Sequence, residues 1–219
     1  MNDPGSTVRT RIRRIPENAV TDRAALHHIL DAGLIAHLAV TDGDQPFVLP
    51  VAYARRGDEV VFHGSTGSRL FRALAAGQPT CLTVTLLDGL VVARSAFHAS
   101  MHYRSVMVLG VAHRLEGDDE LDALRVITEH LLPGRWDDCR RPNAKERAGT
   151  MTLALPLEEC SVKIGTGDPE DEPEDVTDPN LSRVWAGTVP MSESFGTPIR
   201  SADCPAEVEV PSYIEAWHR

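Results

Sequence analysis

The stretch from His63 to Arg69 combines glycines, hydroxyls and a cation at the point where a strand is expected to meet a helix. Glycine lets a backbone approach a ligand closely, and the first N–H groups of a helix attract anions. The hydroxyls of Ser65 and Ser68 can donate to phosphate oxygens, and the Arg69 guanidinium can donate two parallel bonds. An arginine in a first helical turn that lacks a carboxylate opposes the helix dipole unless an anion is bound. The segment therefore indicates a phosphate site, and the alternative is an ordinary loop with solvated arginines.

Residues 94–106 form a second polar stretch, set between two apolar segments. Polar side chains in this density are costly to bury unless they face a ligand or a partner subunit, so a site is plausible here. His98 and His102 are four residues apart, which would suit a metal on a helix. The flanking residues predict strand and turn instead, and no cysteine or carboxylate completes a ligand set, so we predict no metal. His37 lies in an apolar strand and is interpreted as a core or interface histidine.

Familiar catalytic signatures do not occur in the sequence. The P-loop pattern GxxxxGK[ST] fails at residues 63–69, and no GxGxxG follows a predicted strand. A GxSxG nucleophile elbow is also absent from the sequence, and no order of serine, histidine and aspartate is favoured over another. Nucleotide hydrolysis, Rossmann-type dinucleotide binding and serine hydrolase chemistry are therefore not favoured.

Composition describes an ordinary globular chain of 219 residues, with 42% apolar and 25% charged residues. Basic residues number 22 against 32 acidic, a net charge of −10, and seven of the acids lie within residues 168–178. The remainder is close to neutral, so no broad basic face is available for nucleic acid. No apolar stretch approaches the roughly 20 residues of a membrane helix, and the basic N-terminus has no apolar segment behind it. We expect a cytoplasmic protein. The four cysteines are widely spaced with no CxxC pair, which argues against a zinc site, and a cytoplasmic location argues against disulfides, so we interpret them as free thiols.

The elements expected to position these residues are mostly strands. Hydrophobic periodicity and capping signals predict helices at 21–33, 68–76 and 118–132. Alternating apolar segments predict strands at 34–41, 46–54, 59–63, 80–87, 90–95, 103–115, 150–155 and 160–164. Turns are expected at 42–44, 55–58 and Asp88-Gly89. Six to eight strands joined by hairpins, with three or so helices, predict a mainly β fold: a β-barrel or sandwich with peripheral helices.

The composition changes after Gly167. The acidic run is followed by a chain rich in proline, with Trp185, Tyr213 and Trp217 as its large apolar residues. This pattern is typical of an extended arm docked by aromatic anchors, and the alternative is a disordered tail. We therefore predict one domain over residues 1–167, followed by an acidic linker and arm over 168–219 that is no independent domain.

Three segments form a pattern in this order along the chain: residues 47–53 (FVLPVAY), residues 61–65 (VFHGS) with Ser68 and Arg69, and residues 101–106 (MHYRSV) with Gly110. Together they resemble the pyridoxamine 5'-phosphate oxidase-like, FMN-binding split-barrel superfamily. The chain looks most like the branch of nitroimidazole-resistance reductases and flavin-nucleotide-binding proteins. The resemblance covers about residues 8–165, and residues 185–190 (WAGTVP) look like a C-terminal extension found in that branch.

The resemblance implies a split β-barrel homodimer that holds FMN in clefts at the subunit interface. It implies that the strand 49–53 lies along the isoalloxazine, that the loop after His63 holds the phosphate, and that residues 103–105 complete the site. The cofactor-binding residues it assigns are Leu49, Pro50, Val51, Ala52, Tyr53, His63, Gly64, Ser65, Ser68, Arg69, Tyr103, Arg104 and Ser105.

Two departures separate this chain from the pyridoxamine phosphate oxidases themselves. Arg69 stands where a lysine is common, and residues 215–219 (EAWHR) lack their Arg-Leu-x-Pro ending, so vitamin B6 oxidation is not favoured. The resemblance instead implies an FMN-dependent oxidoreductase that reduces a small electrophilic compound with a reduced nicotinamide. His63 and His102 are candidates for proton transfer. The alternatives are a non-enzymatic flavin-binding protein for storage or sensing, and a haem- or deazaflavin-binding member of the fold.

Overall fold

The structure of this chain is a computed structural model, and it describes residues 2–217. The last two residues of the C-terminal sequence 215–219 therefore lie outside the described residues. The chain forms two compact units, each assembled from three separate segments. The first unit holds residues 1–33, 81–109 and 157–192, and the second holds 34–80, 110–156 and 193–219. The predicted boundary at Gly167 lies inside the first unit and stays a prediction. Each unit is described by itself.

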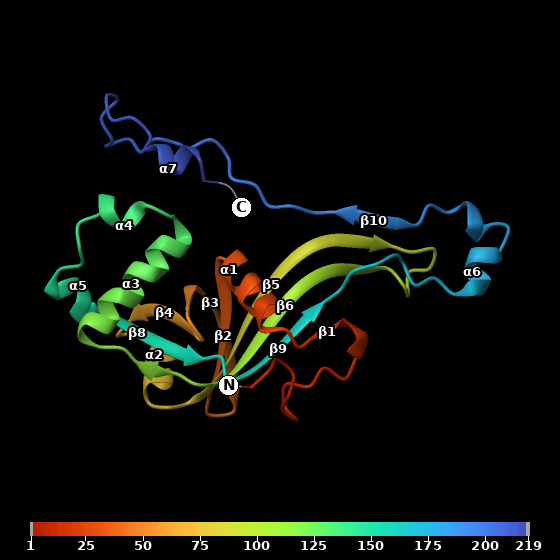
Figure 1. Cartoon of the computed structure of the whole chain (residues 1–219), viewed down its shortest axis with the longest axis horizontal. Helices are drawn as coiled ribbons and strands as arrows, with labels where there is room; N and C mark the ends of the chain where they lie inside the picture. Colours follow the sequence, from red (N-terminus) through yellow and green to blue (C-terminus); the bar gives the residue numbers. More distant parts are fainter. Residues whose placement is uncertain (1, 218–219) are drawn as a thin grey trace. The chain divides into compact units, whose positions relative to one another are not determined.

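Ten strands occur within residues 2–217, so the prediction of a mainly β fold is confirmed (Figure 1). In the first unit the strands lie in the order β1 (Ala19–Val20), β9 (Glu159–Ile164), β6 (Ser100–Val111), β5 (Pro79–Val92) and β10 (Gly187–Pro190). In the second unit the order is β2 (Ile35–Asp42), β3 (Gln45–Arg56), β4 (Glu59–Ser65), β8 (Thr150–Pro156) and β7 (His113–Arg114). Every pair along that second series is antiparallel.

The first unit begins with the short 3-10 helix η1 (Pro16–Asn18) and the helix α1 (Arg23–Ala32), which confirms the predicted helix at 21–33. The Asp22 side chain caps α1 by accepting from the Ala24 amide at 3.0 Å. Leu26, Ile29 and Leu30 recur at helical spacing and are fully buried. Gly33 follows the helix, and its N–H donates to the Ile29 carbonyl.

The second unit is built on hairpins whose turns the sequence predicts. Gly43 and Gly57 adopt φ of 59° and 60°, the left-handed conformation that tight hairpins need. Four helices lie between β4 and β8 along the chain: α2 (Arg69–Ala75), α3 (Gly117–Leu131), α4 (Arg135–Asp138) and α5 (Ala144–Gly149). The helices predicted at 68–76 and 118–132 are confirmed as α2 and α3, whereas the two short helices were not predicted. No helix in residues 2–217 is long and apolar enough to cross a membrane.

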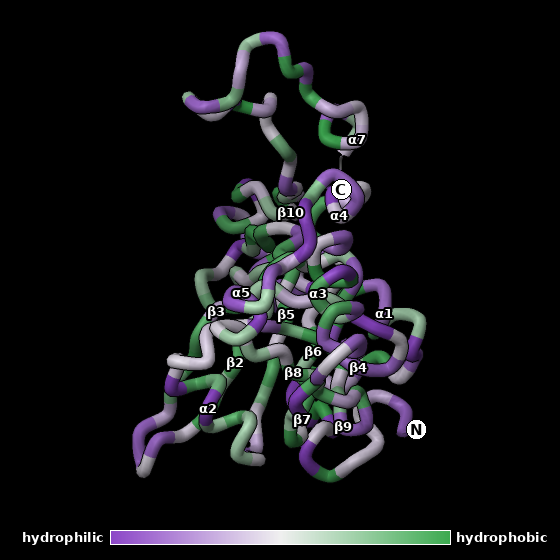
Figure 2. Tube along the Cα trace, turned by 90° about the vertical axis from the view of Figure 1, so that its left-hand side faces the viewer, coloured by the Kyte–Doolittle hydropathy of each residue, from purple (hydrophilic) through white to green (hydrophobic). Residues whose placement is uncertain are grey.

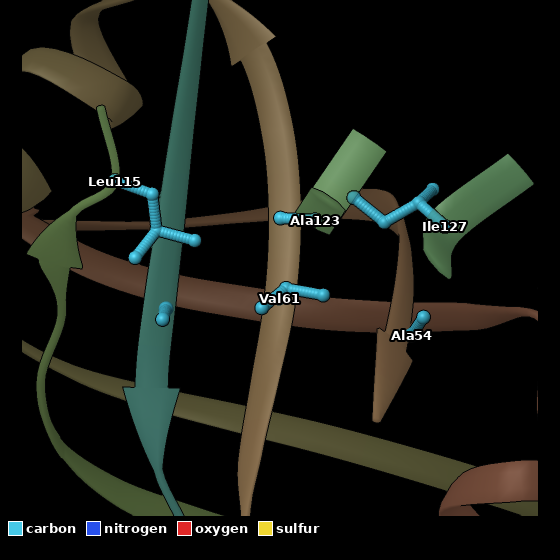
Figure 3. Close-up of a cluster of buried hydrophobic side chains, with 6 residues drawn as sticks. Ala54, Val61, Leu115, Ala123 and Ile127 are labelled. Carbon is cyan, nitrogen blue, oxygen red and sulfur yellow. The ribbon is translucent and has the colours of Figure 1, made fainter. Parts of the chain in front are cut away.

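The core of the second unit joins α3 to the β3–β4–β8 sheet. Ala123 and Ile127 of α3 pack on Ala54 of β3 and Val61 of β4, with Leu115 beside them (Figure 3). All of these side chains are at most 4% exposed. Their burial fixes the hairpin β3–β4, whose far end carries the loop after His63.

The predicted turn at Asp88-Gly89 is wrong, because β5 runs without interruption from Pro79 to Val92. The Asp88 carboxylate instead accepts two bonds from Arg104, at 2.7 and 2.9 Å. Gly89 lies opposite Pro190 of β10, and a Cβ there would come within 3.0 Å of the Val189 carbonyl oxygen. Glycine at this position serves a close approach of two strands rather than a turn.

The single strand predicted at 103–115 is also wrong in its bounds. β6 starts earlier, at Ser100, and ends at Val111, and Ala112 separates it from β7. Half of the polar stretch at 94–106 is therefore strand. The predicted strand at 90–95 ends early, at Val92, and a loop covers residues 93–99.

The segment after Gly167 carries the helix α6 (Pro173–Thr177), the 3-10 helix η2 (Leu181–Arg183), β10 and the helix α7 (Ser212–Glu215). In Figure 2 hydrophilic and hydrophobic residues are interspersed along the trace of the segment bearing α7. In the second unit, the Tyr213 ring packs against Gly134, and its hydroxyl donates to Asp138 at 2.7 Å. Trp217 stacks on Phe195 with ring centroids 4.3 Å apart. Tyr213 thus joins this segment to α4, whereas Phe195 and Trp217 both belong to the segment itself, and the docked arm stays a prediction.

Candidate functional site

A pocket of about 170 Å3 opens in the second unit, where the end of β2, the start of β3 and the start of α2 meet. It includes three of the residues predicted to bind the cofactor. Its lining comprises Val40, Thr41, Asp42, Phe47, Leu49, Ser68, Arg69, Leu70, Ala73 and Gln78.

The register of the β2–β3 hairpin builds one wall of this pocket. Val40 lies directly opposite Phe47, Asp42 opposite Gln45, and Leu38 opposite Leu49. Residues that face each other across an antiparallel pair project from the same side of the sheet. Phe47 and Leu49 therefore share the side on which Val40 is buried. The sequence carries this signal, because a two-residue turn fixes the register of a hairpin.

Arg69 stands over the Phe47 ring, with its guanidinium carbon 3.8 Å from the ring centroid. One of its terminal nitrogens lies 3.1 Å from the Asp42 carboxylate. The first turn of α2 contains no carboxylate, as predicted, but Asp42 at the end of β2 supplies one from outside the helix. The side chains of Arg69 and Asp42 are 59% and 53% exposed, so this ion pair contributes little to stability.

The loop between β4 and α2 uses part of its polar groups internally. The Ser65 hydroxyl accepts from the Gly67 amide at 3.1 Å, and the Thr66 amide donates to the Gly149 carbonyl at 3.1 Å. Ser68 is the N-cap of α2, yet its side chain makes no capping bond. Of the predicted phosphate ligands in this loop, Ser68 and Arg69 thus reach the pocket, whereas Ser65 is engaged in shaping the loop.

Gly64 has a packing role that the sequence analysis missed. A Cβ on Gly64 would lie 2.2 Å from the nearest atom of the Phe71 ring. Phe71 is buried and meets Phe62 edge-on, with ring centroids 6.0 Å apart. Because residue 64 has no side chain, Phe71 of α2 can pack directly against β4. This contact fixes the position of α2 and therefore of Ser68 and Arg69 at its start.

His63 lies next to this glycine on β4, opposite Thr152 of β8. Its ring remains exposed, but desolvation by the surrounding protein lowers the pKa of His63 below its ordinary value. The lowered pKa favours the neutral form of the imidazole. The hydroxyl of Thr152 is buried and has no hydrogen-bond partner in the described part of the chain.

The remaining predicted residues of β3 follow Leu49 away from the pocket. Pro50 is exposed, Val51 and Ala52 are half-buried, and Tyr53 is fully buried. The Tyr53 ring lies 5.5 Å from the ring of His130 on α3. Its side chain belongs to the core, so only its backbone is available to a ligand.

Tyr103, Arg104 and Ser105 belong to β6 and are described with the first unit. The bidentate ion pair with Asp88 holds the Arg104 guanidinium and is the main reason that the pKa of Arg104 is raised. Tyr103 and the candidate proton donor His102 line a separate cavity of the first unit. Within residues 2–217 no group of three or more histidine, cysteine, aspartate or glutamate side chains could hold a metal ion.

The match to a known family covers the pocket described above and the strands from β2 to β9. The family model described as pyridoxamine 5'-phosphate oxidase matches residues 22–164. The chain belongs to this family. A search of curated proteins found no match to it.

The similarity to two solved structures covers most of the length of this family member. The flavocytochrome Anf3 from Azotobacter vinelandii is 37% identical, with a TM-score of 0.89 and 98% of each chain covered. The FAD and haem binding protein from Mycobacterium smegmatis is 36% identical, with a TM-score of 0.85, covering 90% of this chain and 96% of that one. A proposed 5-nitroimidazole antibiotic resistance protein from Bacteroides thetaiotaomicron shares the fold at 19% identity and a TM-score of 0.57, covering 67% of this chain and 86% of that one. The split-barrel fold that the resemblance predicts is confirmed.

Proposed function

We propose that this family member is a flavin-binding oxidoreductase that reduces a small electrophilic compound with a reduced nicotinamide as donor. The observation that carries the proposal is the likeness to the flavocytochrome, which extends over 98% of both chains. The FAD and haem binding protein, 36% identical, supports the same cofactor class. A cytoplasmic location remains part of the proposal.

The pocket residues fit the phosphate end of a flavin nucleotide. The Ser68 hydroxyl makes no capping bond, and the Arg69 guanidinium stands at the pocket, held by one weak ion pair. Phosphate oxygens would accept from both groups. Phe47 and Leu49 supply an apolar wall beside them. The Gln78 side-chain amide donates to the hydroxyl of Thr41 at 2.9 Å and also to its carbonyl, which fixes the opposite rim.

When bound, the flavin supplies the hydride or electron transfer. In this proposal the protein binds and orients it through Ser68 and Arg69, and β3 passes its backbone along the ring system. The neutral imidazole of His63 can accept a proton or hydrogen-bond the ligand. His102 is the other candidate proton donor, on β6 of the first unit.

FMN is the cofactor that the sequence resemblance implies, and we retain it as the first proposal. FAD shares the isoalloxazine and the first phosphate, and it is named for the protein from M. smegmatis. Heat release and chromatography of the chromophore would separate the two.

A homodimer with the cofactor at the subunit interface is the proposed assembly. The side of the β2–β3 hairpin away from the core carries Ile35 and Val48, which are 56% and 58% exposed. His37 and Pro50 face each other on the same side and are also exposed. An apolar sheet face of this kind is typical of a covered interface, and a second copy would cover it isologously.

Sedimentation of the wild type and of Val48→Asp tests the dimer. Val8→Asp is the control, because Val8 is another exposed apolar residue. A monomeric wild type would contradict the dimer.

The pocket assignment predicts a specific effect of removing Arg69. Arg69→Ala should weaken flavin binding roughly tenfold to a hundredfold, the range of one charge-assisted contact. Arg72→Ala is the matched control, because Arg72 lies on the same helix and does not line the pocket. Flavin fluorescence titration gives both dissociation constants. Full flavin affinity in Arg69→Ala would remove the phosphate assignment.

Turnover separates an enzyme from a flavin store or sensor. Flavin-loaded protein that oxidises reduced nicotinamide steadily with an artificial acceptor would support the oxidoreductase. A flavin-loaded protein that is inert with several donors would favour the non-enzymatic alternative.

A flavocytochrome is the second candidate function, because both structures at 36–37% identity are named for a flavin with haem or as a flavocytochrome. If haem binds, the exposed side chain of His63 would hold its iron. Haem added to the protein should then give a sharp Soret band that His63→Ala shifts and His37→Ala leaves in place. An unchanged spectrum in His63→Ala would exclude this residue as the ligand.

A further inference from the structure

The largest cavity among those described lies in the first unit, and of its lining residues only His102 and Tyr103 belong to the flavin site predicted above. It holds about 570 Å3, within the range of small-molecule sites. Its lining comprises Arg14, Ile15, Asn18, Val91, Phe97, His98, Ala99, Ser100, Met101, His102, Tyr103, Lys163, Gly165, Thr166, Asp168 and Glu170. These residues unite the polar stretch at 94–106 with the start of the acidic run.

The acidic run fixes one wall of this cavity. The side chain of Asp171 is 3% exposed and accepts two bonds of 2.7 Å from Arg94, one from its amide and one from its guanidinium. Glu172 lies 3.5 Å from the Nε2 atom of His98. These contacts hold the loop 93–99 in place, so part of the acidic run has a structural role here rather than forming a solvated tail.

The opposite rim carries a strained backbone. Ile15 adopts φ of 53°, and it is the one residue other than glycine with positive φ among the described residues. A β-branched residue in this conformation is a genuine outlier, and such strain concentrates at ligand sites. The Lys163 ammonium donates to the Arg14 carbonyl at 3.1 Å, which leaves it further donors for a ligand.

The cavity offers three kinds of groups side by side. Phe97 is 88% exposed, and together with Tyr103 it supplies aromatic faces. Arg14 and Lys163 supply cations, and Asp168 supplies a carboxylate. Aromatic faces stack on bases, cations bind phosphate, and a carboxylate can accept from ribose hydroxyls.

We propose that this cavity of the first unit is a binding site for an adenylate group, that is, an adenine nucleoside 5'-phosphate. Its Phe97 and Tyr103 would contact the base, Lys163 and Arg14 the phosphate, and Asp168 the ribose. The aromatic faces distinguish it from a site for a bare anion, and its carboxylates disfavour a polyanion.

Two ligands of the proposed function contain an adenylate group. One is the adenylate half of FAD, if the flavin is FAD. The other is the adenylate half of the nicotinamide donor, which would bind while the flavin is in place. Both sources rest on the proposed function, but binding of AMP itself does not, so the two can fail separately.

The first test uses the two lysines of the chain. AMP should slow acylation of Lys163 by an amine-reactive ester, read by peptide mass spectrometry, at least fivefold at saturation. Lys145, on α5 in the second unit, is the internal control and should react at an unchanged rate. Protein stripped of any cofactor and protein loaded with FMN or with FAD are compared. Protection by AMP in the stripped protein supports the site even if no flavin binds.

The source of the adenylate follows from the loaded proteins. If FAD occupies the cavity, FAD protects Lys163 and FMN does not. If the donor occupies it, AMP protects Lys163 in the FAD-loaded protein as well. Lack of protection by AMP in every form overturns the proposal.

Substitution of the aromatic residue gives the second test. Phe97→Ala should lower the affinity for AMP, measured by equilibrium dialysis, roughly fivefold or more, the range of one stacked base. Val8→Ala is the control, because Val8 is 76% exposed and does not line the cavity. The FMN affinity of Phe97→Ala should equal that of the wild type. Equal losses for AMP in both variants, or an unchanged affinity in Phe97→Ala, would contradict the base contact.

Discussion

Gly64→Ala tests whether the glycine after His63 serves packing or ligand approach. The added Cβ would lie 2.2, 2.5 and 2.6 Å from three atoms of the Phe71 ring, whereas an ordinary contact is at least about 3.4 Å. The ring would have to retreat by more than 1 Å, and it is only 4% exposed and meets Phe62. Overpacking a close-packed core costs about 1–3 kcal/mol, and three clashing atoms on one rigid ring place Gly64→Ala at the upper end.

Denaturant unfolding with a fluorescence readout measures this change in the free energy of unfolding. Gly67→Ala is the matched control in the same loop: its Cβ would meet only the Ser65 hydroxyl, at 3.5 Å, so its effect should stay within about 0.5 kcal/mol. Phe71→Leu should partly relieve the clash, so the double variant should be more stable than the sum of the single effects allows. If Gly64→Ala unfolds like Gly67→Ala, the packing argument is refuted and close approach of a ligand becomes the better explanation of this glycine.

Two further predictions concern charge. His63 has a pKa below the ordinary value of about 6.5, so the unfolded chain binds more protons than the folded one as the pH falls from 6.5 through the folded pKa. Stability should therefore fall in this window, and His63→Gln should flatten the slope, whereas equal slopes in both proteins would contradict it. Asp171→Asn should release the loop 93–99, with amide exchange at Arg94 faster by roughly tenfold. Asp175→Asn in the same acidic run is the charge-matched control. Equal exchange rates at Arg94 in the two variants would contradict the role of Asp171 in holding the loop.

Local signals predicted the elements whose causes are local. The side chain of Asp22 caps α1 and Gly33 follows it, and both were visible in the sequence. Gly43 and Gly57 similarly mark the hairpins of the second unit through their positive φ. In these places the residues that decide the structure lie within a few positions of the element they decide.

The wrong predictions concern segments whose structure depends on residues that are distant in the sequence. Asp88-Gly89 has the composition of a hairpin turn, but Arg104 binds the aspartate and β10 pairs along the glycine. Both partners stabilise an extended strand, and neither is close in sequence. Contacts over such separations override local turn propensity. β10 lies in a proline-rich segment, and for this reason its pairing with β5 was not predicted.

The residues of the candidate site also fall into those that the sequence predicted and those that it did not. Ser68 and Arg69 were predicted from residue type and from their place at a helix start, and the structure brings both into one pocket with Leu49. Asp42 and Phe47 were not predicted as pocket residues, although the register of the β2–β3 hairpin determines which side of the sheet each of them faces. The packing of Phe71 against Gly64 could not be predicted, because it depends on the path of α2 over β4.

The contacts of Arg69 decide whether the pocket can accept an anion at all. Its partner Asp42 is 53% exposed, so it regains most of its hydration when the pair separates, and an exposed pair contributes at most about 1 kcal/mol. A charge-assisted bond to a phosphate contributes about 1.5–3 kcal/mol, and a second oxygen of the same phosphate can accept from Ser68. The phosphate therefore outcompetes the aspartate. Phe47 keeps the guanidinium over its ring in either state, so the exchange of partners needs little movement of the arginine. Asp42→Asn should accordingly strengthen flavin binding, while Phe47→Ala should weaken it by loosening the arginine, and titration of the two variants against the wild type would show opposite shifts.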